Sequence, residues 1–191
     1  MNRKSIIAAA VFAAVAGAGA LSMAPAAYAE MTVMVGGAPM YPSKNIIENA
    51  VNSKDHTTLV AAVKAAGLVD TLMGAGPFTV LAPTNEAFAA LPKGTVATLL
   101  KPENKATLTG ILTYHVIAGK FTMADIAAKV DEMGGKFTVA TVNGANVTFM
   151  RSGSKHLTVT DAKGDVARIT IADVLQSNGV IHVINKVLLP G

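Results

Sequence analysis

The order of its sequence patterns limits the fold of this chain more than any other feature: helical periodicity fills the first half and strand-like runs fill the second. Leu59, Val63 and Ala66 share one face of a predicted helix. Residues 137–142 and 146–151 are β-prone runs on either side of an Asn-Gly pair, which is typical of a hairpin turn. Helices followed by strands favour an α+β fold with an antiparallel-rich sheet over repeated βαβ units.

Glycine and proline divide the first half into short elements. Gly67 ends the first amphipathic helix, and residues 68–73 predict a shorter one. A buried strand is expected at 78–82, and Thr84 can cap the helix that follows it. A further helix, interrupted by a Lys-Pro pair, is expected within residues 95–119, where a glycine stops it.

Strand-like runs continue to the end of the chain. Residues 156–160 and 166–171 flank another turn, and a last apolar run covers 180–189. No segment repeats at a fixed period, and 191 residues lie within the range of one ordinary domain. The sequence therefore predicts a single copy of one domain.

The N-terminal segment has the pattern of an export signal. Two basic residues precede the apolar run 6–21, and an Ala-Tyr-Ala site follows, so we expect residues 1–29 to be a secretory signal peptide cleaved after Ala29. A membrane anchor is the alternative, but the run is shorter than the roughly 20 residues of a spanning helix. Residues 30–42, rich in Gly, Met and Pro, are expected to form an exposed lead-in segment before the domain at 43–191.

Charge and residue types argue against several classes of function. The formal net charge is +4, but the lysines are scattered singly rather than gathered in a stripe that would bind nucleic acid. There is no cysteine, and the sequence has no G-x-S-x-G nucleophile motif. His56, His115, His156 and His182 are also isolated from one another. We therefore assign no catalytic, cofactor-binding or metal-binding residue and no nucleic-acid partner.

Three segments together resemble the conserved motifs of the fasciclin (FAS1) family. They are the box at 79–88, the pair Tyr114-His115, and the second box at 177–184. The resemblance covers about residues 45–190. It implies a compact wedge in which a seven-stranded, twisted β-sandwich packs with a cluster of helices. It also implies an extracellular or cell-surface module associated with adhesion and with protein or matrix binding.

The residues of these motifs are expected to serve the fold. His115 follows Leu108 and Ile111 on one helix face, so its ring should be buried, bonded to the backbone and fixed in one tautomer. His182 lies in an apolar strand and should be buried and neutral. The motif residues given a structural role are Thr79, Pro83, Thr84, Phe88, Tyr114, His115, Asn178, Gly179 and His182.

Two surfaces are candidates for partner contact. Asp173 and Val174 align with an Asp-Ile pair that is implicated in integrin recognition in some animal members of the family, with Val in place of Ile. Asp173 could instead cap the turn that follows. The second candidate surface is formed by Met side chains near 68–73 and 123–133, although core packing explains these residues equally well.

The leading hypothesis is an exported, non-catalytic module, secreted or periplasmic and of bacterial origin. It would act in adhesion or bind a cell-surface, matrix or exported protein, without a cofactor and without a membrane span once the signal is removed. One alternative is a periplasmic binder of small molecules that uses a cleft between helices and sheet. The other is a self-associating structural component of the envelope or matrix.

Overall fold

The computed structural model describes residues 32–153 and 156–191. The predicted signal peptide at 1–29 lies outside the described residues. The helical elements are α1 (Ile46–Ala50), η1 (Lys54–His56), α2 (Thr57–Ala66), α3 (Val69–Met73), α4 (Asn85–Ala89), α5 (Thr95–Leu99), η2 (Pro102–Asn104), α6 (Lys105–Tyr114) and α7 (Met123–Glu132). The strands are β1 (Val33–Val35), β2 (Ala38–Met40), β3 (Phe78–Pro83), β4 (Val116–Ala118), β5 (Lys136–Ala140), β6 (Asn146–Ser152), β7 (His156–Thr160), β8 (Val166–Gln176) and β9 (Gly179–Ile184).

Seven of these strands form one hydrogen-bonded series in the order β4-β3-β9-β8-β7-β6-β5. β3 and β9 run parallel, with Phe78 opposite Gly179 and Pro83 opposite Ile184, and every other neighbouring pair is antiparallel. The strands and helices confirm the predicted α+β class with seven strands.

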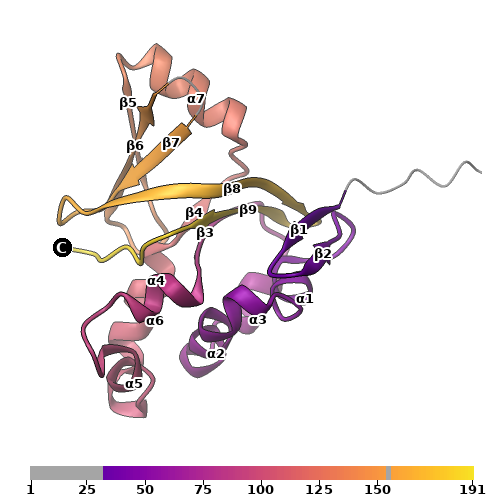
Figure 1. Cartoon of the computed structure of the whole chain (residues 1–191), viewed down its shortest axis with the longest axis vertical. Helices are drawn as coiled ribbons and strands as arrows, with labels where there is room; N and C mark the ends of the chain where they lie inside the picture. Colours follow the sequence, from indigo (N-terminus) through magenta and orange to yellow (C-terminus); the bar gives the residue numbers. More distant parts are fainter. Residues whose placement is uncertain (1–31, 154–155) are drawn as a thin grey trace, which may run out of the picture.

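β8 belongs to both halves of the sheet. Its first residues pair with β7, and its later residues pair with β9 across two irregularities between Ile169 and Val174. Because bulges bend a strand and increase its twist, the sheet changes direction here. In Figure 1 β5, β6 and β7 fan upward beside α7, while β3, β4 and β9 lie above the other helices.

The bent sheet separates two hydrophobic cores. We call the lower one the helical core; it joins α1, α2, α3, α4 and α6 to one face of β3 and β9. We call the upper one the aromatic core; it contains Phe137 and Phe149, whose ring centroids lie 6.1 Å apart, and the apolar face of α7. Val80 and Ala82 belong to the helical core and Leu81 to the aromatic core, as expected for a strand whose side chains alternate between faces.

The expectation of an exposed lead-in at 30–42 is wrong for residues 33–40. They form the β1–β2 hairpin, in which Val35 and Met40 are only 4% and 3% exposed and belong to the helical core. Gly36 and Gly37 turn the chain with φ values of 59° and 76°, which side-chain-bearing residues rarely adopt. Three-residue strands are too short to show a period, so the glycine pair was the available signal for the hairpin.

The helix expected within 95–119 ends earlier than predicted. It consists of α5, η2 and α6, and after Tyr114 the chain becomes strand β4, which pairs with β3. Val116 and Ile117 are buried and extend the cores on both faces of this strand. The tertiary pairing with β3 therefore overrides the helical preference before Gly119 is reached.

Candidate functional site

The parallel pairing of β3 with β9 brings the two motif boxes side by side in the sheet, one strand in from the β4 edge. Thr79 lies opposite Val180, and Leu81 lies opposite His182. The Tyr114-His115 pair precedes β4, the neighbour of β3 on the other side. Residues that are about 100 positions apart in the sequence thus form one continuous group.

Thr79 joins β3 to the connection between β4 and α7. Its side chain is fully buried; the hydroxyl donates to the carbonyl of Gly119 at 2.7 Å and accepts from the backbone N–H of Phe121 at 2.9 Å. A valine here would keep the shape of the side chain but leave both backbone groups without a partner.

The end of β3 is also the start of α4. Pro83 pairs with Ile184, and Thr84 caps α4 by accepting a hydrogen bond from the backbone N–H of Ala87. Phe88, on the inner face of α4, is buried in the helical core. These three residues therefore join the end of β3 to α4 and to the helical core.

Tyr114 anchors the aromatic core to two loops. Its hydroxyl donates to the carbonyl of Asn146 at 2.7 Å and accepts from the backbone N–H of Ala162 at 2.8 Å. Burial is the main reason that the pKa of the phenol is raised. The hydroxyl is held as both donor and acceptor within the fold, so it is not offered to a ligand.

His115 is buried and uses both ring nitrogens. The backbone N–H of Leu188 can only donate, so Nε2 accepts from it at 2.9 Å, and Nδ1–H therefore donates to the carbonyl of Ile111 at 2.8 Å. Burial lowers the pKa of His115 to about 4, against a smaller raising effect of the Ile111 carbonyl. The ring is a neutral link between α6 and the C-terminal segment.

His182 has the opposite tautomer. Its Nδ1 accepts from the backbone N–H of Asp173 at 3.2 Å, and its Nε2–H donates to the carbonyl of Phe121 at 2.9 Å. Burial is the main cause of its lowered pKa, opposed by the Phe121 carbonyl and the Asp173 charge. Both motif histidines thus act as neutral connectors in the fold.

Asn178 and Gly179 shape the tight turn between β8 and β9. The Asn178 amide accepts from the backbone N–H of Ile46 and donates to the carbonyls of Leu72 and Gly74, so one side chain ties together α1 and α3. A Cβ on Gly179 would overlap the carbonyl oxygen of Phe78. Glycine is therefore needed for the close approach of β3 to β9.

The structure changes the interpretation of the Asp173-Val174 pair. Asp173 has φ 54°, and its carboxylate accepts from the backbone N–H of Met123 at 2.7 Å, so it caps the first turn of α7 and not the turn that follows it in sequence. Val174 is 1% exposed and lies in the helical core. Burial excludes Val174 from direct contact with a partner in this conformation.

The two Met-containing segments do not form one surface. Met73 and Met133 are 45% and 60% exposed, but α3 lies in the lower half and α7 in the upper half (Figure 1). Met123 is half-buried against the aromatic core. The second candidate surface is therefore divided between opposite ends of the molecule.

His56 is a buried residue to which sequence reasoning gave no role. It is 3% exposed, its Nδ1 lies 2.9 Å from the hydroxyl of Ser53, and its Nε2 has no hydrogen-bond partner within the described residues. Its pKa is lowered mainly by burial and raised to a smaller extent by a backbone group of Ala82, which faces the ring without meeting hydrogen-bond geometry. His56 lies among polar residues at the start of a helix, and without an apolar pattern around it the sequence gives no signal of burial.

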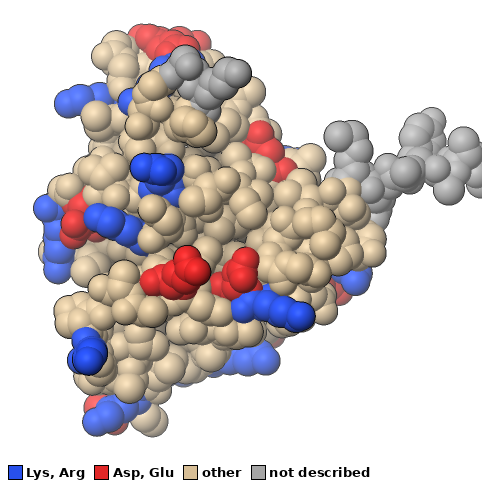
Figure 2. Space-filling model, viewed as in Figure 1, with Lys and Arg blue, Asp and Glu red and all other residues tan. Residues whose placement is uncertain are grey.

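Charged residues are dispersed on the surface. In Figure 2 basic and acidic side chains are interspersed among uncharged ones on the face shown. The best-formed ion pair joins Arg151 and Asp131 through two hydrogen bonds of 2.6 and 2.5 Å, which raise the pKa of the guanidinium and lower that of the carboxyl. Since the pair is solvent-exposed, it contributes little to stability.

Residues 32–153 and 156–191 offer neither a metal centre nor a membrane-spanning helix. Within these ranges, no three His, Cys, Asp or Glu side chains gather closely enough to hold a metal ion. Over the same part of the chain, no helix combines the length and the apolar character needed to cross a membrane.

The seven-stranded bent sheet, the helices below it and the inward-facing motif residues define a single FAS1-type domain. A solved FAS1 domain pair from the insect cell adhesion molecule Fasciclin I superimposes with a TM-score of 0.56 at 23% identity, covering 74% of this chain and 45% of that one. This likeness supports the fold.

Sequence comparisons lead to the family. The fasciclin-domain family model matches residues 54–190. The chain is 47% identical over 178 residues to Protein sll1483 of Synechocystis sp., covering 90% of each chain. It is 34% identical over 210 residues to Immunogenic protein MPB70 of Mycobacterium bovis, covering 100% of this chain and 99% of that one. The chain belongs to the fasciclin family.

Proposed function

We propose that this protein is an exported, non-catalytic fasciclin module that binds a protein or matrix component outside the cytoplasm. Export rests on the signal-peptide pattern at 1–29. The adhesion role rests on family membership and on the likeness to Fasciclin I, which is an insect cell adhesion molecule. The buried polar groups of the motifs support a non-catalytic role, because their hydrogen bonds are used within the fold.

The observation that carries this proposal is a set of exposed apolar side chains around the β8–β9 turn. We call them the turn-end surface: Met34, Val51, Met73 and Leu175, which are 58%, 49%, 45% and 38% exposed. They come from elements in mutual contact, because β2 touches α1 and β8, and α1 touches α3. We infer from these contacts that the four side chains form one patch, and contiguous exposed apolar patches mark protein-binding sites.

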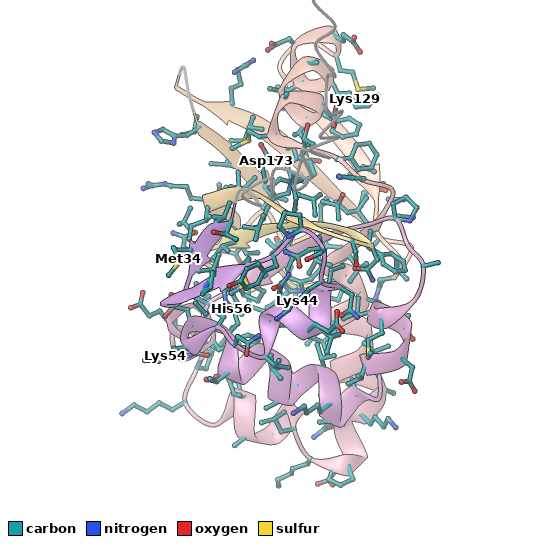
Figure 3. All side chains as sticks on the ribbon, turned by 90° about the vertical axis from the view of Figure 1, so that its right-hand side faces the viewer. Met34, Lys44, Lys54, His56, Lys129 and Asp173 are labelled. Carbon is teal, nitrogen blue, oxygen red and sulfur yellow. The ribbon has the colours of Figure 1, made fainter. Side chains whose placement is uncertain are left out.

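The turn-end surface is also rigidly supported. Asn178 bonds to Ile46, Leu72 and Gly74, and the backbone N–H of Ser177 donates to the carbonyl of Lys44 at 2.9 Å. Met34 and Lys44 are both visible on the side of the molecule shown in Figure 3. A pre-organised apolar surface loses little conformational entropy on binding, which suits direct contact with a protein partner.

Binding of purified protein to intact cells of its source, followed by proximity crosslinking and mass spectrometry, tests this function. We expect saturable binding and capture of a reproducible surface or matrix protein. Leu175→Lys and Met34→Lys should each weaken binding about fivefold or more, equivalent to about 1 kcal/mol. Val166→Lys is the matched control, since Val166 is 47% exposed at the other end of β8.

Two results would contradict the proposal. One is the absence of saturable binding by the unaltered protein. The other is equal binding by the two turn-end variants and the Val166→Lys control, which would place the contact elsewhere. Capture of copies of the protein alone would instead support the structural alternative, in which the module self-associates.

A further inference from the structure

The helical core encloses a cavity of about 50 Å³ between the helices and the sheet. Its walls come from the β1–β2 hairpin, α1, η1, α2, α3 and the lower faces of β3 and β9. The lining is almost entirely aliphatic and includes Val35, Met40, Leu59, Val63 and Ile181. Its volume is several times the roughly 10–15 Å³ needed for one water but about a third of the roughly 150 Å³ cavity that takes benzene, so it suits a guest of only a few heavy atoms.

One polar atom in this lining lacks a partner. The polar side chains that line the cavity are Ser53, His56 and His115. Both nitrogens of His115 are bonded, and Ser53 is bonded to Nδ1 of His56. Nε2 of His56 is buried with no hydrogen bond within the described residues. A buried, unpaired nitrogen is costly, and a bound molecule that supplied a hydrogen bond would remove this cost.

The cavity has a solvent-facing side. Most lining residues are buried, but Ile47, Ala50, Val60 and Leu68 remain half-buried. They belong to α1, to α2 and to the turn before α3. The access route therefore lies between α1 and α2, beneath the hairpin. In Figure 3 His56 lies in the lower half of the molecule and Asp173 in the upper half.

We propose that this cavity binds a small apolar molecule that carries a single hydroxyl group, with the hydroxyl bonded to Nε2 of His56. A hydroxyl can donate or accept, so it fits either tautomer of a neutral imidazole. A carboxylate is excluded, because an unpaired negative charge in an aliphatic cavity would lose its hydration without compensation. This ligand site is separate from the turn-end surface and does not depend on the proposed partner.

Titration of the purified protein with ethanol, followed by NMR of the methyl groups of Val63 and Leu59, tests the proposal. We expect saturable one-to-one binding of ethanol and no binding of acetate. His56→Leu should weaken ethanol binding about tenfold, as expected when a buried hydrogen bond is lost. Xenon, which needs no polar partner, should still enter the His56→Leu protein and so verify that the cavity persists.

Val60→Phe is a second variant, placed at the half-buried mouth so that folding is preserved. It should abolish the binding of both xenon and ethanol, whereas Val166→Phe, at the exposed start of β8, should change neither. The proposal is overturned if ethanol causes no saturable shift, if Val60→Phe binds it as well as the unaltered protein, or if His56→Leu retains full affinity for it.

Discussion

The two cores of this domain are packed in different ways. The aromatic core is built on stacked rings, and the Tyr114 hydroxyl at its edge has both a donor and an acceptor partner. The helical core is aliphatic and contains both the cavity and His56, whose Nε2 is the buried side-chain atom without a partner in the described residues. The two halves thus differ in packing, since the cavity and the unpaired buried nitrogen both lie in the lower half.

The largest expected effect is on the pH dependence of stability, and it comes from His115, which lies at the junction of the two cores. The pKa of His115 is about 4 in the folded protein, whereas the ordinary value for a histidine side chain, which applies to the unfolded chain, is 6.5. The unfolded chain therefore binds a proton that the folded protein excludes, and stability rises with pH between these values. We expect about 3 kcal/mol of stability, fully present above pH 6.5, to be lost as the pH falls toward 4.

Urea unfolding from pH 7.5 to 4 measures this dependence. His115→Ala should lower stability at pH 7.5 and flatten the pH dependence, while His156→Ala, at an exposed position, should leave the stability at pH 7.5 unchanged. His182 and His56 titrate in the same direction, so a smaller slope remains in the His115 variant. An unchanged slope in His115→Ala would show that the buried ring is not the source.

The second prediction compares the same substitution in both cores. Val147 is fully buried in the aromatic core, and Val63 lines the cavity. Val147→Phe should destabilise the protein by about 3 kcal/mol through overpacking. Val63→Phe should cost less than about 1 kcal/mol, because part of the ring fills existing space. Thermal melting of both variants measures the two destabilisations. Equal losses of stability would contradict the proposed difference in packing between the cores.

The third prediction compares two buried histidines. His182→Leu should cost about 2 kcal/mol, since it leaves the Phe121 carbonyl and the Asp173 N–H unpaired. His56→Leu should change stability by less than about 1 kcal/mol, because the orphaned nitrogen is removed along with the one bond to Ser53. Chemical denaturation at pH 7.5 gives both values. A larger loss for His56→Leu would mean that its nitrogen is paired in solution.

The smallest effect concerns the cap that Asp173 supplies to α7. Asp173→Ala should cost about 1–2 kcal/mol, because it removes the acceptor for the Met123 N–H and places alanine at φ 54°. Asp173→Asn should be nearly neutral, since asparagine caps helices and tolerates this conformation. Denaturation curves compare the stabilities of the two variants, and hydrogen exchange of the Met123 amide reports whether its hydrogen bond to residue 173 is retained. Equal stability of both variants would argue against the capping role.

Sequence patterns predicted the elements with long periods and clear punctuation. The α2 helix ends at Gly67 in the left-handed conformation, and β5 and β6 flank the turn at Gly144, as expected. The burial of His115 and His182 was also predictable, because each lies within an apolar pattern. Patterns along a chain carry this information because they reflect which face of an element is buried.

The remaining features depend on contacts between distant segments. The β1–β2 hairpin and β4 are three-residue strands whose conformation is fixed by pairing and burial, so neither shows a period. The role of Asp173 requires β8 to lie beside the start of α7. The cavity is formed where several elements meet, and no local pattern reports the volume that their side chains leave unfilled.

The position of β9 has a consequence for how the protein is made. β9 is the last strand in sequence, yet it lies between β3 and β8 in the sheet. During synthesis, β3 must therefore wait for residues about 100 positions later before its parallel partner exists. Such non-local pairing slows folding and leaves strand edges exposed in the meantime. The sheet lacks the strand between β3 and β8 until β9 has emerged, so a chain shortened to end before Gly179 should be unable to complete the fold.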